Sequence, residues 1–124
     1  MTKDEAAALL EIYGKAWVTR DADLIVTIFT EDATYHDPRE PENAGREAIR
    51  AYWTDKVING QKDISFDLNN VWIDSDTVIA EWHAEFTNIK RGLRIKMDEV
   101  AIFATRDGKF SSLREYYQSE KTPL

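Results

Sequence analysis

The stretch "TYHDP" at residues 34–38 places Asp37 directly before a proline. Proline holds the preceding residue extended, and an aspartate there can accept hydrogen bonds from nearby backbone amides, so turn formation is one interpretation. A carboxylate at the end of a strand can also face a pocket and remove a proton from a bound substrate, so a catalytic base is the other. The local sequence leaves both interpretations open.

A second carboxylate is notable for the pattern around it. In the segment 93–105 alternate residues are apolar, and Glu99 is the one charged member of that row. Alternate residues of a strand face one side of a sheet, so Glu99 is expected inside, unless a one-residue slip puts Asp98 there instead. Glu115 shares a side with Tyr117 in the last strand in the same way. Such discordant polar residues are expected at functional sites.

Helices are expected to cover these groups from the N-terminal half. Residues 3–19 have apolar side chains spaced as on one face of an amphipathic helix, with Tyr13 and Trp17 on that face. Asp21 is a favourable N-cap for a second helix, which is expected to include Phe29.

A strand over 33–37 and a loop, "PREPENAG" at 38–45, connect the second helix to a third. The third helix is expected over residues 46–58, and Asn59-Gly60 is a typical helix stop.

The second half of the chain changes to the two-residue period of β-strands. Turn signals separate four expected strands at 64–74, 77–88, 93–105 and 109–119. Helices followed by antiparallel strands predict an α+β fold, in which the helices gather on one face of the sheet.

Composition excludes several classes of function. The 124 residues, with 43% apolar and 31% charged side chains, predict one globular domain over residues 1–124. The net charge of −7 disfavours nucleic acid as a partner, and no stretch is apolar enough to span a membrane, so we expect a cytoplasmic protein. There is no cysteine, metal-ligand motif or glycine-rich phosphate loop, and we therefore expect neither a metal nor a cofactor.

Three stretches together resemble the SnoaL-like group of the nuclear transport factor 2-like superfamily. They are "AWVTRDADLIVTIFTEDATYHDP", "GREAIRAYW" and "FATRDGKFSSLREYY", and the resemblance covers nearly the whole chain. It implies a cystatin-like α+β cone, in which three N-terminal helices pack on the concave face of a curved, mainly antiparallel sheet and enclose a pocket. Members of the superfamily commonly form dimers through their sheets.

The catalytic pattern that resembles this sequence most is that of bacterial ketosteroid isomerase. The resemblance assigns Asp37 as the base that removes a proton next to a carbonyl group. It assigns Tyr13 and Glu99 as the donors that hydrogen-bond to the oxygen that gains charge. It also implies substrate-binding positions, to which the inward rows of the helices and strands add others: Trp17, Trp53, Trp82, Ala84, Phe86, Glu115 and Tyr117.

Three functions stay open at this point. The first is a cofactor-free enzyme acting on a small hydrophobic carbonyl compound, as an isomerase, a polyketide cyclase or a dehydratase. The second is a non-catalytic domain that binds a hydrophobic small molecule. The third is a dimeric association module. The bulk of Trp53 and Trp82 can reduce the pocket below the size of a steroid, which argues for a smaller ligand.

A homodimer through the sheet is predicted from the polar side of the strands. Glu81 and Glu85 on one strand stand opposite Arg94 and Lys96 on the next, with Arg114 nearby. Complementary rows of charge of this kind can pair across a two-fold interface.

Overall fold

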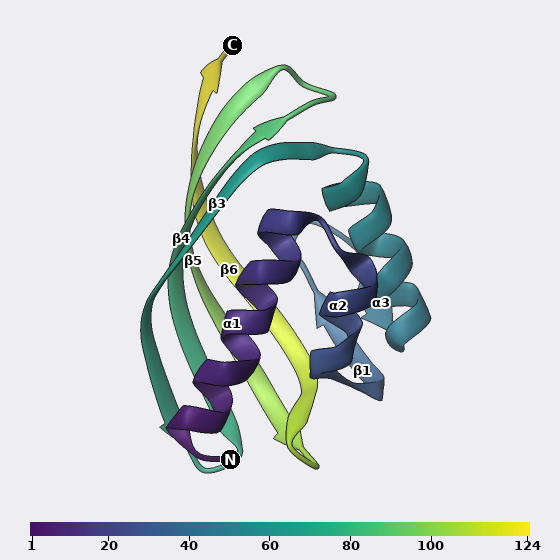
Figure 1. Cartoon of the computed structure of the whole chain (residues 1–124), viewed down its shortest axis with the longest axis vertical. Coiled ribbons are helices and arrows are strands. Elements are labelled where there is room, and N and C mark those ends of the chain that lie inside the picture. Colours follow the sequence, from purple (N-terminus) through teal and green to yellow (C-terminus); the bar gives the residue numbers. More distant parts are fainter.

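The computed structural model describes residues 1–124 as helices and strands around one curved sheet (Figure 1). The elements, in chain order, are α1 (Lys3–Thr19), α2 (Ala22–Ile25), the 3-10 turn η1 (Val26–Ile28), β1 (Phe29–His36), β2 (Asn43–Ala44), α3 (Arg46–Trp53), the π-helical turn η2 (Thr54–Ile58), β3 (Gln61–Asp74), β4 (Thr77–Asn88), β5 (Leu93–Arg106) and β6 (Lys109–Pro123).

Helix α1 begins at a capping box, which confirms its predicted start. The Thr2 hydroxyl accepts the Glu5 amide at 3.1 Å, and the Glu5 carboxylate accepts the Thr2 amide at 3.0 Å. The helix ends where Arg20 adopts a left-handed conformation. Its buried face includes Tyr13 and Trp17, so the predicted amphipathic pattern is confirmed.

The second helix is shorter than predicted. Asp21 is its N-cap, as expected, because its carboxylate accepts the Leu24 amide at 2.9 Å. The prediction that the helix includes Phe29 was wrong, since Phe29 is the first residue of β1 and pairs with Phe110 of β6. The spacing of Ile25, Ile28 and Phe29 fits a helix locally, but pairing with a distant strand overrides it.

Replacing Asp21 by Ala is expected to lower the free energy of unfolding by about 1 kcal/mol, because one amide at the helix start loses its acceptor. Asp21→Asn is the matched control, since asparagine caps a helix as well as aspartate does and should leave the stability nearly unchanged. Urea unfolding followed by circular dichroism measures both. Equal losses in the two variants would contradict a capping role.

The predicted loop 38–45 also contains a short strand. Residues 43 and 44 form β2, which pairs antiparallel with Thr34 and Tyr35 of β1. The helix that follows is helical to residue 53 and continues as a π-helical turn to residue 58. The expected stop at Asn59-Gly60 is confirmed. At Gly60 a Cβ atom would lie 2.6 Å from the Lys56 carbonyl oxygen, so the close approach of backbone here requires glycine.

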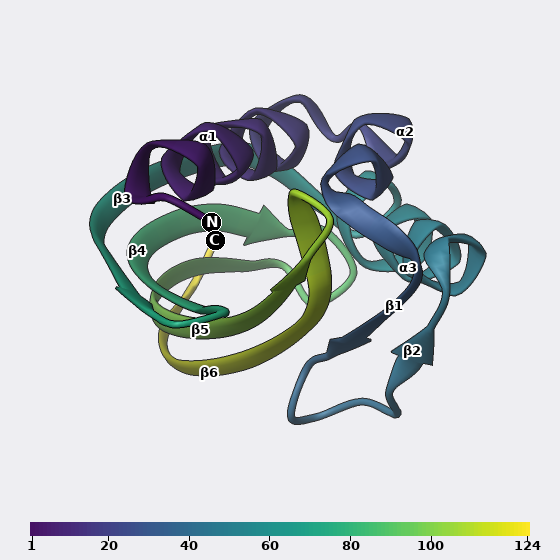
Figure 2. The ribbon, with the colours of Figure 1, turned by 90° about the horizontal axis from the view of Figure 1, so that it is seen from below.

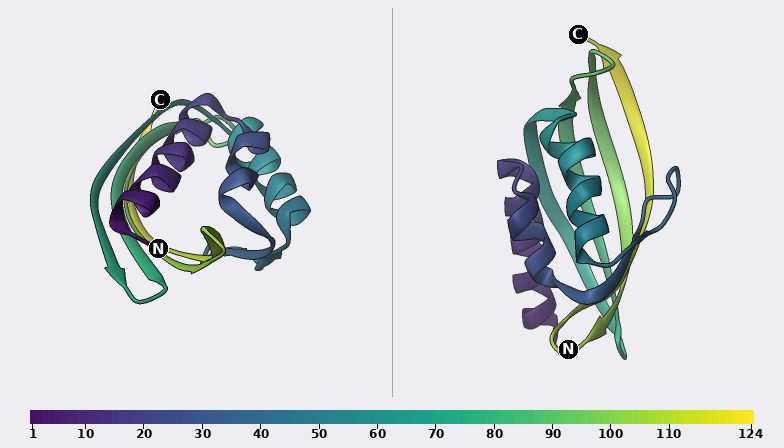
Figure 3. Two further views of the ribbon diagram at one scale, coloured as in Figure 1. Left: turned by 60° about the horizontal axis from the view of Figure 1, so that its bottom comes forward. Right: turned by 90° about the vertical axis from the view of Figure 1, so that its right-hand side faces the viewer.

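The sheet has six strands in the order β2-β1-β6-β5-β4-β3. Strands β3 to β6 are successive antiparallel neighbours, while β1 pairs parallel with β6, so the sheet is mixed but mainly antiparallel. Figure 2 shows β3 to β6 as concentric arcs with α1 across their concave side, and Figure 3 shows α3 on the same side of the sheet as α1. The predicted α+β cone is confirmed.

The predicted alternation of inward and outward side chains is confirmed in the strands that carry site residues. The inward row of β4 is fully buried, and Glu99 lies inward on β5 with 3% of its surface exposed. In β6 the register shifts between Phe110 and Ser112, so that Phe110 and Leu113 both face inward. This bulge places Glu115 on the concave side. The buried apolar side chains form one cluster under the helices. No helix is both long and apolar enough to cross a bilayer.

Candidate functional site

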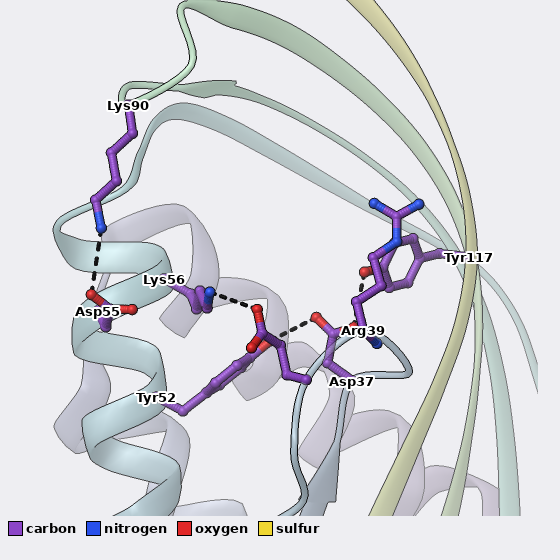
Figure 4. A network of polar contacts seen from close by, with 8 residues as sticks. Asp37, Arg39, Tyr52, Asp55, Lys56, Lys90 and Tyr117 are labelled. Atoms are coloured by element: carbon purple, nitrogen blue, oxygen red, sulfur yellow. Dashed lines mark hydrogen bonds and ion pairs between the residues drawn. The ribbon is translucent and has the colours of Figure 1, made fainter.

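Asp37 directly follows the last residue of β1 and lies where the strand meets the end of α3. Its Oδ2 atom accepts the Tyr52 hydroxyl at 2.8 Å, and its Oδ1 atom accepts the Tyr117 hydroxyl at 2.9 Å and the Arg39 amide at 3.0 Å (Figure 4). Both carboxylate oxygens of Asp37 therefore have hydrogen-bond donors within the protein. Asp37 therefore shapes the turn and also presents a carboxylate held by two tyrosines.

The segment that follows Asp37 is held by contacts of Glu40 and Arg39 with neighbouring elements. The Glu40 carboxylate pairs with the Lys56 ammonium at 2.7 Å, and the Arg39 guanidinium lies over the Tyr117 ring, 5.1 Å from its centroid (Figure 4). These contacts join the segment to the turn after α3 and to β6. The mouth of the site is therefore bordered by charged groups that are already paired.

Glu115 lies deeper, at the centre of a buried polar cluster. Its Oε1 atom accepts the Tyr35 hydroxyl at 2.9 Å and the Tyr13 hydroxyl at 3.1 Å, and the two hydroxyl oxygens are 3.2 Å apart. Burial, followed by the negative charge of Asp37, raises the pKa of Glu115 to about 7. Burial and the Glu115 charge also raise the pKa of both tyrosines well above the usual value, so they act as neutral donors.

Glu99, rather than Asp98, faces inward. The Asp98 side chain is 80% exposed and contacts His83 on the outer face, whereas Glu99 is buried opposite Trp82 in the β4–β5 register. Its Oε2 atom has no hydrogen-bond partner. Burial and then the nearby Glu115 carboxylate raise the pKa of Glu99 well above the usual value, which favours its neutral form.

A small cavity connects Asp37 and Glu115. Its volume is about 60 Å³, and ten residues line it: Tyr13, Trp17, Tyr35, Asp37, Tyr52, Trp53, Lys56, Val57, Gln61 and Glu115. Ligand pockets for drug-sized molecules are typically ~300–1,000 Å³, and the share of one water in the liquid is about 30 Å³. The cavity therefore fits a molecule of a few non-hydrogen atoms and is too small for a steroid.

The structure brings together six of the ten predicted site residues. Five of them line the cavity: Tyr13, Trp17, Asp37, Trp53 and Glu115. Tyr117 reaches the site through its hydrogen bond to Asp37. The other four lie in the core outside the cavity wall: Trp82, Ala84, Phe86 and Glu99.

Sequence reasoning missed five lining residues: Tyr35, Tyr52, Lys56, Val57 and Gln61. Tyr35 had a usable signal, because it stands two residues before Asp37 in the same extended stretch and so shares its side. Tyr52, next to Trp53 on α3, had no such signal, because its contact with Asp37 depends on how α3 packs. No group of three or more histidine, aspartate or glutamate side chains is arranged to hold a metal ion.

Fold and site together define a cone-shaped α+β domain with a small internal cavity, of the nuclear transport factor 2-like class. The chain belongs to the SnoaL-like domain family, whose model matches residues 9–113. Comparison with curated protein sequences gave no match.

Several solved structures share this fold. The epoxide hydrolase/cyclase-like enzyme SalBIII, described in pyran ring formation in the polyether salinomycin, is 28% identical, with a TM-score of 0.77 and 95% of each chain covered. An NTF2-like protein from Anabaena variabilis is 24% identical, with a TM-score of 0.82, covering 94% of this chain and 89% of that one. An LEH-like epoxide hydrolase from M. tuberculosis is 16% identical, with a TM-score of 0.76 and coverages of 93% and 84%.

Proposed function

We propose that this protein is a small-molecule enzyme that works by general acid–base catalysis without a cofactor. The observation that carries the proposal is the pair of unlike carboxyl groups on one cavity. Three donors hydrogen-bond to the oxygens of Asp37, whereas Glu115 is deeply buried and its pKa is raised by burial to about 7. A base and an acid on one cavity are what a proton transfer within a bound substrate requires.

The reaction we propose is proton abstraction next to a carbonyl group. Asp37 takes the proton, and the electron pair of the broken C–H bond moves toward the carbonyl oxygen, which gains negative charge. Protonated Glu115 donates a hydrogen bond to that oxygen. Return of the proton to another carbon completes an isomerisation, and attack by the carbon on a second carbonyl group gives an aldol-type cyclisation.

In this proposal Tyr13 and Glu99 act through Glu115 and do not themselves donate a hydrogen bond to the substrate. Tyr13 already donates to Glu115 at 3.1 Å, so it reaches the substrate oxygen only by giving up that acceptor. Glu99 lies outside the cavity wall, and burial together with the Glu115 charge raises its pKa, which favours retention of a proton on the pair. We therefore assign Glu99 as a positioning residue in this proposal.

Deuterium exchange tests the proposal without knowledge of the product. Acetone and butanone in D₂O exchange the hydrogens next to the carbonyl when a base removes them, and proton NMR follows the loss of signal. We expect exchange to be faster with the protein than in buffer of equal pH. Exchange at the buffer rate over a panel of small ketones would overturn proton abstraction next to a carbonyl.

Epoxide opening is a second candidate, favoured by the 28% identity to the epoxide hydrolase/cyclase-like enzyme. The same two groups suffice: Asp37 takes a proton from water or from a substrate hydroxyl, and Glu115 protonates the epoxide oxygen as its C–O bond breaks. Small epoxides and hydroxy-epoxides, followed by NMR for diol or cyclic ether, separate this reaction from the first. Binding of a ligand with neither reaction would leave a non-catalytic binding domain.

We also propose a homodimer through the outer face of the sheet. That face combines the predicted charges with exposed apolar side chains: Trp72 is 49% and Tyr116 50% exposed, and Ile79, Val100 and Ile102 lie on the same side. A patch of this kind is typical of a protein–protein contact. Light scattering at micromolar concentration should give twice the chain mass of 14.3 kDa, and Tyr116→Glu, but not Tyr116→Phe, should give the monomer. A monomeric wild type would contradict the proposal.

A further inference from the structure

Half of the ten residues that line the cavity are aromatic. Trp17 and Trp53 both stand nearly perpendicular to Tyr13, at 87° and 90°, with ring centroids 6.2 and 5.8 Å from it. Tyr35 and Tyr52 form another pair, with centroids 5.2 Å apart. Five rings therefore surround a space of about 60 Å³. The face of an aromatic ring carries partial negative charge.

The tyrosine hydroxyls on this wall already donate their hydrogen atoms to carboxylates of the protein. Tyr13 and Tyr35 donate to the Glu115 carboxylate, and Tyr52 donates to the Asp37 carboxylate. A hydroxyl has one hydrogen, so each of these groups meets a ligand as an acceptor. An incoming anion or carbonyl oxygen finds no free hydroxyl donor among them.

Two nitrogen donors of the wall, those of Trp17 and Lys56, are occupied in the same way. The Trp17 indole donates to Gln61 at 2.7 Å, and the Lys56 ammonium is paired with Glu40 at 2.7 Å. Trp53 Nε1 is enclosed by protein atoms and has no partner. The charged groups that face the cavity are thus two carboxyls, Asp37 and Glu115, and one ammonium that is already neutralised.

We propose that this cavity is an aromatic cage for a small alkylammonium group, of the size of dimethyl- or trimethylammonium. A cation in the cage is attracted by the ring faces and by the carboxylates, and its small alkyl groups fill the apolar space. The protein's net charge of −7 favours approach of such a ligand. Neutral molecules of equal shape gain the apolar contacts but not the electrostatic attraction.

This inference names a ligand class for the site of the proposed function, and it rests on that cavity being the ligand site. A substrate would carry its ammonium group beside the reacting carbon. Positive charge there stabilises the carbanion that forms when Asp37 removes the proton. The ammonium group would then supply charge stabilisation that the tyrosines do not supply. When Glu115 is charged and pairs with the cation, the ammonium group replaces the hydrogen bond that protonated Glu115 donates in the mechanism proposed above.

Binding of trimethylammonium chloride, followed by NMR chemical shifts at pH 8, tests the ligand class directly. Propan-2-ol and acetone are neutral probes of similar shape, and sodium chloride controls for ionic strength. We expect trimethylammonium to bind at least ten-fold more tightly than either neutral probe. Its affinity should also fall by several-fold at pH 5.5, because Glu115 then gains a proton while the ligand stays charged. Equal affinity for the neutral probes, or no change with pH, would overturn the inference.

Two variant pairs locate the site. Glu115→Gln should weaken trimethylammonium binding at least ten-fold, whereas Glu120→Gln, on the exposed part of the same strand, should not. Trp17→Leu removes one wall of the cage and should abolish the preference for the cation, whereas Trp72→Leu on the outer face should keep it. Unchanged binding in both Glu115→Gln and Trp17→Leu would place the cation elsewhere and overturn the inference.

The two proposals fail separately. If trimethylammonium binds in the cage but neither ketone hydrogen exchange nor epoxide opening is seen, the proposed enzymatic function is wrong and the ammonium site stands. If ketone hydrogens exchange but the cavity does not prefer a cation, the ammonium site is wrong and the proposed enzymatic function stands.

Discussion

Replacing Asp37 by Asn is expected to lower kcat/KM for exchange next to a carbonyl by about 10²- to 10⁴-fold, the range for loss of a general base. The asparagine amide keeps the shape of the side chain but cannot take the proton. Exchange rates of ketone hydrogens in D₂O, for wild type and variant side by side, measure the effect. A variant with half the wild-type rate would show that Asp37 is not the base.

The structure defines what else this substitution changes. Two tyrosine hydroxyls and one amide donate to the Asp37 carboxylate, and an asparagine can accept on its oxygen alone. We expect a loss of about 1 kcal/mol in the free energy of unfolding from the donor left without an acceptor. Circular dichroism and urea unfolding confirm that the variant is folded. Asp74→Asn, at an exposed position of β3, is the matched control and should change neither rate nor stability.

The protein is expected to become less stable as the pH rises from 5.5 to 8, by roughly 2 kcal/mol from Glu115 alone. Burial raises the pKa of Glu115 from the usual 4.5 to about 7, so between these values the folded state binds more protons than the unfolded state. The stability that this difference provides is fully present below the unfolded pKa and is lost as the pH rises to about 7. The pKa of Glu99 is also raised by burial, so its contribution has the same sign. Urea midpoints across this range measure it.

Glu115→Gln should flatten this dependence and raise the stability at pH 8, because the neutral amide keeps an oxygen for Tyr13 and Tyr35. One other group acts in the same direction: hydrogen bonds to Asp98 and Glu85 raise the pKa of His83, so its contribution is also lost with rising pH. His83→Asn, on the outer face, separates the two. An equal pH dependence in wild type and Glu115→Gln would contradict the buried, proton-binding role of Glu115.

The sequence by itself determined the fold class and the facing of most side chains. A strand has a period of two residues, so the apolar row of β4 and the row that contains Glu99 could be assigned before any strand was placed. Helix starts were equally local, because Thr2 and Asp21 supply the oxygen atoms that the first helical amides need. Phe29 was the exception, since its conformation is set by pairing with Phe110, far along the chain.

The tertiary structure alone decided which inward residues form a site. Trp53 and Trp82 are both buried and aromatic, yet Trp53 lines the cavity and Trp82 lies in the core. The sequence cannot separate them, because burial depends on side-chain type whereas access to a cavity depends on the gap left between packed elements. The tyrosine donors around Asp37 and Glu115 come from four elements that meet only in the folded chain. In the folded chain these tyrosine hydroxyls donate to the two carboxylates, and the packed side chains leave a cavity of about 60 Å³. The remaining hydrogen-bonding groups and this volume limit which ligands the site can bind.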